Sequence, residues 1–155
     1  MAWQNSAVAD ITHKTDSTIE QLGDLAALQG CSESELQRLA ALGETTDWFP
    51  GSALKVEGRR PDKVQLVLTG RILTTRNGRI VSHAGPGTAV SDVEILSGSS
   101  APDSITTVTT TRTLAFRPRE FASGLDSCPA FRGLILRSLA RRVAGIAGRE
   151  RHVHA

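Results

Sequence analysis

Few side chains in this 155-residue sequence have the types and spacing that catalysis or metal binding needs. His83 is the only histidine in the middle of the chain, whereas a metal enzyme needs clustered histidines and carboxylates. Cys31 and Cys128 stand far apart without metal or redox spacing, so each is expected to be a small buried apolar residue. Ser97 to Ser100 lacks the context of a nucleophile elbow, and no Walker or dinucleotide glycine motif occurs. We therefore expect no catalytic residue, no metal site and no enzyme.

Positive charge is unevenly placed along the chain. No lysine or arginine occurs from Ile80 to Thr111. From Arg132 onward, in contrast, the sequence contains six arginines and only one acidic residue, Glu150. Such a basic helix suits an acidic protein, a nucleic acid or an anionic membrane surface, although a solvated helix face is its simplest interpretation. The net charge of +2 does not by itself indicate nucleic-acid binding.

Length and composition favour one folded domain with an aliphatic core, because aromatic residues make up only 4% of the chain. Residues 1–16 are polar and predict a flexible arm without the features of a signal peptide. No stretch approaches the roughly 18 apolar residues of a membrane span. We expect a cytoplasmic protein that has reduced cysteines and does not enter a membrane.

Helices are predicted at both ends of the chain. Apolar spacing indicates a helix over residues 18–28, and the capping box Ser32/Glu35 begins a second over residues 33–42. Near the C-terminus, residues 118–121 form a short turn closed by Gly124, and a longer helix begins at Pro129. That helix frays after Gly148, which divides the chain into an arm (1–16), a domain (17–148) and a flexible basic tail (149–155).

The middle of the chain predicts antiparallel strands. Between residues 46 and 111, β-branched runs are interrupted by glycine and proline about every 8–12 residues, which is typical of a sandwich or barrel. Asn77-Gly78 lies between two such runs, 72–75 and 80–83, and predicts a tight hairpin. About eight short strands between terminal helices make an α+β fold, an antiparallel β-roll or jelly roll.

This order of turns and helices resembles the cyclic-nucleotide-binding domain family, over residues 20–145. The resemblance rests on Pro50-Gly51 followed by Glu57-Gly58, on Gly70 directly after a strand, on Gly85-Pro86-Gly87, and on the closing helices. In that family a Gly-Glu pair starts a short helix that receives the cyclic phosphate, and the glutamate binds the ribose hydroxyl. About ten residues later, an arginine pairs with the phosphate.

The resemblance implies a degenerate phosphate-binding cassette. Ser91 stands where glycine is expected and Asp92 where glutamate is expected, while Ala101 to Ser104 covers the place of the arginine, with Asp103 adding negative charge. Losing the cation removes roughly 1.5–3 kcal/mol from phosphate binding. We therefore expect no cofactor, and no cAMP or cGMP bound in the usual way. The cassette residues are Gly87, Val90, Ser91, Asp92, Ala101, Pro102, Ser104, Thr106 and Thr107.

The resemblance therefore implies a small regulatory or protein-interaction module without a helix-turn-helix. The helix from Pro129 serves as its contact surface for a partner protein or for a second copy in a homodimer. Two alternatives stay open: an atypical sensor of a cyclic nucleotide or another small ligand, and an accessory nucleic-acid binder. The residues assigned to the interaction helix are Phe131, Ile135, Arg137, Leu139, Arg141, Arg142 and Val143.

Overall fold

The computed structural model describes residues 15–154, with side chains up to residue 145. The predicted arm therefore lies outside the described residues except for its last two positions. These two positions are already helical, because the first helix spans residues 15–24 rather than starting at 18. No helix in the described part of the chain is both long enough and apolar enough to span a bilayer.

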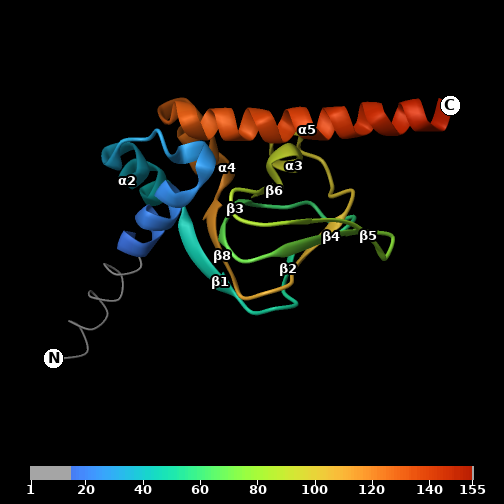
Figure 1. The fold of residues 1–155 in the computed structure, drawn as a ribbon, viewed down its shortest axis with the longest axis horizontal. Coiled ribbons are helices and arrows are strands. Elements are labelled where there is room, and N and C mark those ends of the chain that lie inside the picture. Colours follow the sequence, from blue (N-terminus) through green and yellow to red (C-terminus); the bar gives the residue numbers. More distant parts are fainter. Residues whose placement is uncertain (1–14, 155) are drawn as a thin grey trace.

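The N-terminal helices form a small layer at one end of the molecule (Figure 1). The first is followed by the 3-10 turn η1 (Ala26–Leu28) and by α2 (Glu33–Leu42). The capping box that begins α2 is confirmed, since Ser32 Oγ accepts from the Glu35 amide and Glu35 accepts from the Ser32 amide. Leu36 and Leu39 point from α2 into the core.

Among residues 15–154, eight strands form two antiparallel four-stranded sheets, which confirms the predicted β-roll. Apart from the β4–β5 hairpin, neighbouring strands in each sheet are far apart in the sequence, because the chain crosses between the two sheets. The first sheet has the order β1 (Glu44–Trp48), β8 (Thr111–Phe116), β3 (Val64–Thr69), β6 (Ala89–Val90). The second has the order β2 (Ala53–Lys55), β7 (Ser104–Thr107), β4 (Ile72–Arg76), β5 (Arg79–Ala84).

The β4–β5 hairpin turns at Asn77-Gly78 as predicted. Asn77 has φ 52° and Gly78 has φ 75°, the left-handed conformation at both corners that a two-residue hairpin needs. Ile72, at the start of β4, is buried between the sheets.

Three helices complete the fold: α3 (Asp92–Ser97), α4 (Pro118–Ser127) and α5 (Pro129–His154). Helix α4 does not end at Gly124 as the sequence analysis predicts. Gly124 is buried and a Cβ there would lie 3.2 Å from the ring of Phe131, so the glycine lets α4 and α5 approach closely. Helix α5 continues through residues 149–154, the segment expected to be a flexible tail, and its side chains after residue 145 are outside the described ones.

The main core lies between the helical layer and the first sheet, and it is aliphatic apart from a phenylalanine cluster. Phe131 of α5 packs 5.3 Å from Phe116 and 5.9 Å from Phe121, measured between ring centroids. A second, smaller core fills the space between the two sheets and includes Val67 and Ile105. Figure 1 shows the consequence for the site: α5 lies along the top of the roll and passes over α3.

Candidate functional site

The candidate site is the turn and short helix between β6 and β7. Ser91 precedes α3 with φ 72°, the left-handed conformation that glycine adopts without strain. Gly98 ends the helix with φ 68°. The family resemblance expects a glycine at Ser91, and this backbone geometry gives the physical reason for that expectation.

Two carboxylates of α3 are buried and face α5. Asp92 is fully buried and Glu94 is 2% exposed. Arg142 reaches both from α5, with Nη2 3.1 Å from Asp92 Oδ1 and Nη1 3.5 Å from Glu94 Oε1. Burying a carboxylate without a cation is costly, so the charge of Arg142 helps to keep the two acids inside the fold.

Lys55 is a second cation beside these buried carboxylates. It comes from β2, is 4% exposed, and donates to Glu94 Oε1 at 3.2 Å. Its Nζ also lies 2.7 Å from Oδ1 of Asp103, directly before β7. Lys55 and Asp103 are neighbours because β2 pairs with β7, with Lys55 opposite Ile105.

The charges in this cluster balance among the side chains described. Arg76 of β4 approaches Asp103 Oδ2 at 3.8 Å and adds a third cation. The three carboxylates, Asp92, Glu94 and Asp103, therefore meet three cations, Lys55, Arg76 and Arg142. We call these six residues the cassette ion cluster. It ties α3 to strand β2 on one side and to helix α5 on the other.

The loop after β2 is hydrogen-bonded to the backbone of the segment between α3 and β7. The Gly58 amide donates to the Ala101 carbonyl, and the Ala101 amide donates to the Arg59 carbonyl, both at 2.8 Å. The Arg60 side chain donates to the carbonyl of Gly98 at the end of α3. The segment from α3 to β7 is thereby held by neighbouring protein groups on several sides.

The other predicted cassette residues have mostly structural contacts. Thr107 is buried; its hydroxyl accepts from the Ser52 amide and donates to the Phe49 carbonyl. Ser104 accepts from the Glu57 amide. Val90 and Ala101 are buried, Pro102 is exposed, and the backbone of Gly87 has φ 90°, while Thr106 is half-buried. The hydroxyls of Ser104 and Thr107 thus make hydrogen bonds within the fold, and the assignment of these residues to ligand binding stays a prediction.

The lack of a cation that the sequence predicts for the cassette holds only within the segment itself. Residues 80–111 lack lysine and arginine, yet Lys55 and Arg142 come to the cassette from distant segments. No signal in the sequence identifies Lys55 as a buried cation, since a single lysine in a three-residue strand looks like an ordinary exposed lysine. Arg142 was assigned to a contact surface, but it is turned toward α3.

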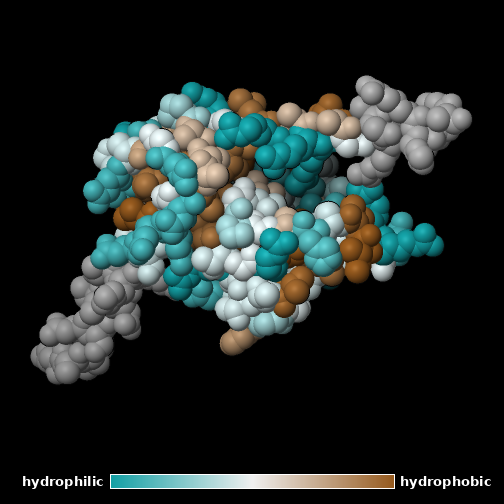
Figure 2. Space-filling view, in the orientation of Figure 1, coloured by the Kyte–Doolittle hydropathy of each residue, from teal (hydrophilic) through white to brown (hydrophobic). Residues whose placement is uncertain are grey.

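The predicted interaction helix also needs correction. Phe131 is fully buried and Ile135 is 2% exposed, so both belong to the core and are not available to a partner. Leu139 is partly buried against the same core, whereas Arg137 and Arg141 are exposed. The exposed apolar residues on α5 are Leu136 (59%) and Val143 (66%) among those described. Figure 2 shows hydrophobic atoms gathered along α5 and at the β4–β5 end of the roll.

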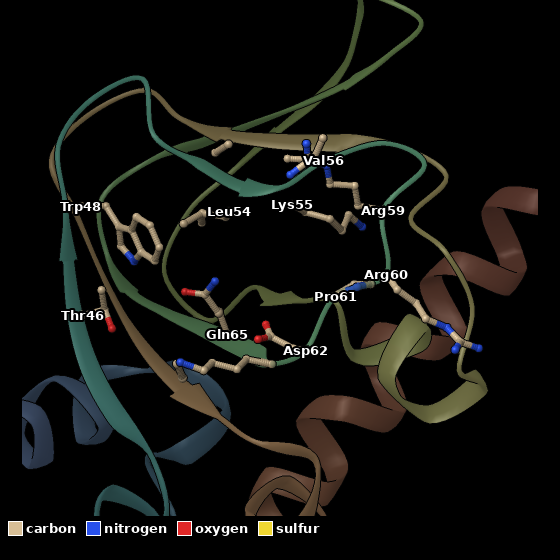
Figure 3. Close-up of a pocket in the computed structure, with 13 residues that line it drawn as sticks. Thr46, Trp48, Leu54, Lys55, Val56, Arg59, Arg60, Pro61, Asp62 and Gln65 are labelled. Carbon is tan, nitrogen blue, oxygen red and sulfur yellow. The ribbon is translucent and has the colours of Figure 1, made fainter.

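A cavity of about 350 Å³ opens on the other side of Lys55, between the sheets (Figure 3). Trp48 and Gln65 line it, with Trp48 Nε1 donating to Thr113 and Thr113 donating to Gln65 Oε1. The basic residues Arg59 and Lys63 also line it. The sequence analysis missed this cavity, because its lining comes from β1, β2, β3, β8 and the loop before β3.

The two cysteines are neighbours in the fold, contrary to the sequence analysis. Their sulfur atoms and a Glu35 carboxylate oxygen all lie within 4.8 Å of one another. Cys128 is buried and Cys31 is half-buried. Burial and the nearby Cys128 raise the pKa of the Cys31 thiol to about 11.

No protein-family model matches the sequence, and no curated protein matches it. Solved structures do match. The catabolite activator protein of Thermus thermophilus superposes with a TM-score of 0.72 at 18% identity, covering 83% of this chain and 62% of that one. The regulatory subunit of a cAMP-independent protein kinase A from Trypanosoma brucei gives 0.66 at 20% identity, covering 84% and 47%.

A third match is the cyclic nucleotide-binding-like protein of Brucella abortus, with a TM-score of 0.56 at 19% identity, covering 71% of this chain and 98% of that one. The chain has the fold of a cyclic-nucleotide-binding domain. It spans about three fifths of the Thermus protein and half of the trypanosomal subunit.

Proposed function

We propose that this chain is a regulatory or protein-interaction module in which protein cations hold the cassette helix in place of a cyclic nucleotide. The observation that carries the proposal is the pair of contacts made by Lys55, to Glu94 at 3.2 Å and to Asp103 at 2.7 Å. Asp103 lies in the segment where the resemblance expects the phosphate-binding arginine, so the sign of the charge there is reversed.

The cluster is a poor receptor for a phosphate. Its three acids already neutralise its three cations, so an added anion would have to compete with a carboxylate for Lys55, which is buried, or for Arg76 or Arg142, which are partly exposed. Asp92 Oδ2 and Glu94 Oε2 are buried acceptors without a hydrogen-bond partner among the described residues. Both would repel a phosphate oxygen, and against them the cluster offers one buried donor without a partner among the described residues, Arg76 Nε, whereas phosphate sites present several donors.

Helix α5 is the element that such a module would use to signal. Arg142 connects it to α3, so a change in the cassette shifts the contacts that hold α5. The exposed Leu136 and Val143 lie seven residues apart on one face of α5 and offer a contact for a partner protein or a second copy. The trypanosomal relative is described as part of a cAMP-independent kinase, which is a precedent for this fold working without cAMP. We place the module in the cytoplasm and assign it no enzyme activity or cofactor.

Hydrogen exchange tests this proposal. In the Arg142→Gln variant, amides of α3 and of the middle of α5 should exchange faster than in the wild type, because the link between the helices is removed. The matched control, Arg141→Gln, alters an exposed neighbour and should leave both helices unchanged. Adding cAMP to the wild-type protein should change neither helix. Slower exchange in α3 on adding cAMP would overturn the proposal.

A second candidate function, a sensor of a small anionic ligand, is favoured by the cavity in Figure 3. Gln65 is 8% exposed and keeps its amide nitrogen free of hydrogen bonds among the described residues, and Arg59 and Lys63 supply positive charge beside the Trp48 ring. Titration with nucleoside monophosphates, followed by fluorescence, tests it. Quenching that is saturable in the wild type and absent in Trp48→Phe supports this function, whereas an unchanged spectrum excludes it for these ligands.

Nucleic-acid binding through α5 is the weakest alternative. Of its described arginines, Arg142 is turned toward the carboxylates of α3 and Arg132 donates to the Leu125 carbonyl. Arg137 and Arg141 stay exposed. Binding by such a surface would fall steeply with added salt, so a lack of retention on heparin at low salt would exclude it.

A further inference from the structure

Cys31 and Cys128 meet where the helical layer joins α5. Cys31 lies in the turn between η1 and α2, and its amide donates to the Leu28 carbonyl. Cys128 lies between α4 and α5, and its amide donates to the Gly124 carbonyl. These backbone bonds hold the main chain at both cysteines, and the two sulfur atoms lie within 4.8 Å of each other although the residues are distant in the sequence.

Glu35 supplies a third group at the same place. One oxygen, Oε1, accepts from the Ser32 amide and hydroxyl at 3.2 and 3.0 Å, which holds the carboxylate in one orientation. No hydrogen bond from a described residue reaches its Oε2. The carboxylate is therefore positioned by the capping box while an oxygen remains available.

Two sulfurs and one carboxylate oxygen within 4.8 Å of one another match the ligands that zinc prefers. We propose that Cys31, Cys128 and Glu35 form a three-ligand site for a thiophilic divalent cation of the zinc class. Cys31 and Glu35 are half-buried, so an ion can enter from solvent, and a fourth position stays open to water. On binding, each thiol loses a proton to solvent and the two thiolates and the carboxylate coordinate the ion.

The third ligand favours metal binding over a plain thiol pair. A disulfide needs only Cys31 and Cys128 and makes no use of a carboxylate that has an oxygen within 4.8 Å of both sulfur atoms. A pair of protonated thiols packed in the core, with neither metal nor disulfide, has no need of the Glu35 carboxylate either. A bound ion would join the η1–α2 turn to the α4–α5 junction, and so would fix the base of the helix that the proposed function uses.

Cobalt provides the direct test, since thiolate coordination gives a charge-transfer absorption that histidine ligands do not. The full chain, kept reduced, should bind one Co²⁺ with this band, and Zn²⁺ should displace it and raise the melting temperature. Cys31→Ser should abolish the band. Cys128→Ser should also abolish it, with circular dichroism confirming the fold. A reduced wild-type protein without the band, or a Cys31→Ser variant that keeps it, overturns the proposal.

The role of Glu35 has a matched test. Glu35→Gln retains the capping box, because glutamine makes the same hydrogen bond, but removes the anionic ligand. Cobalt affinity should fall at least tenfold. Glu33→Gln, in the same helical turn but outside the cluster, should bind like the wild type. Equal affinity of the Glu35→Gln and wild-type proteins would overturn the three-ligand site, as would formation of a disulfide that Zn²⁺ does not slow.

Discussion

Arg142 Nη2 lies 3.1 Å from Asp92 Oδ1, which joins the middle of α5 to the first residue of α3. The acid is fully buried, while the arginine side chain is 32% exposed. The partly exposed Arg142 therefore neutralises the buried charge of Asp92, and this ion pair links α5 to the cassette helix α3. The proposed regulation depends on this connection between the two helices.

Replacing Arg142 with methionine should lower the free energy of unfolding by about 2–3 kcal/mol. Breaking a buried pair costs about 3–5 kcal/mol, and the partial exposure of Arg142 reduces the effect. Urea denaturation with an unchanged m-value measures it. Arg141→Met should stay within about 0.5 kcal/mol of the wild type. Equal stabilities of the two variants would contradict the importance of the Arg142 contacts.

Lys55 and Asp103 should be energetically coupled. Lys55→Met leaves Asp103 without its nearest cation, and Asp103→Asn leaves Lys55 with Glu94 alone. The double variant removes both charges, so it should be more stable than the sum of the single effects predicts, by about 1–3 kcal/mol. A double-mutant cycle from urea denaturation gives this value. Simple additivity would show that the two charges do not interact.

Gly70→Ala should destabilise the protein by more than about 2 kcal/mol. Gly70 has φ 101°, and a Cβ there would lie 2.6 Å from the Thr110 carbonyl oxygen, so both strain and collision oppose the change. Gly145→Ala, in a helix with open space around it, should instead stabilise by about 0.5–1 kcal/mol. Thermal melts of both variants test this, and a stable Gly70→Ala protein would contradict the described turn.

Metal-free protein should lose stability at alkaline pH through Cys31. Its pKa is raised from 9.0 to about 11 in the folded state, so folding favours the protonated thiol. The resulting stabilisation is complete below pH 9 and is lost as the pH rises toward 11. Comparing the free energies of unfolding of the wild type and the Cys31→Ser variant between pH 9 and pH 11 isolates the effect. A constant difference across the window would contradict the raised pKa.

Local sequence signals predicted most of the fold. The Ser32/Glu35 capping box and the Asn77-Gly78 turn are short-range features, and each element lies where they indicate. Gly124 misled the prediction, because glycine also serves where two helices pack closely, and that need arises only in the tertiary structure. Helix α5 begins at Pro129 as predicted, because the amide hydrogen that proline lacks would have no partner within the helix at this first position.

The site was harder to predict because its partners are remote in the sequence. Asp92 was identified through the resemblance, but its cation Arg142 lies 50 positions later and on a different element. Lys55 is buried only because Glu94 and Asp103 neutralise it, which composition does not reveal. The nearness of Cys31 and Cys128 likewise follows from helix packing, since the two are far apart in the sequence and neither has a histidine nearby.

The replacement of a nucleotide by protein charges is tested most directly by calorimetric titration of the wild-type protein with cAMP. The cassette ion cluster has no unbalanced cation for a phosphate among the described residues, so the account predicts no saturable heat at millimolar cAMP. Cyclic GMP and cyclic dinucleotides should behave alike. Saturable binding of cAMP with a micromolar Kd would contradict the account.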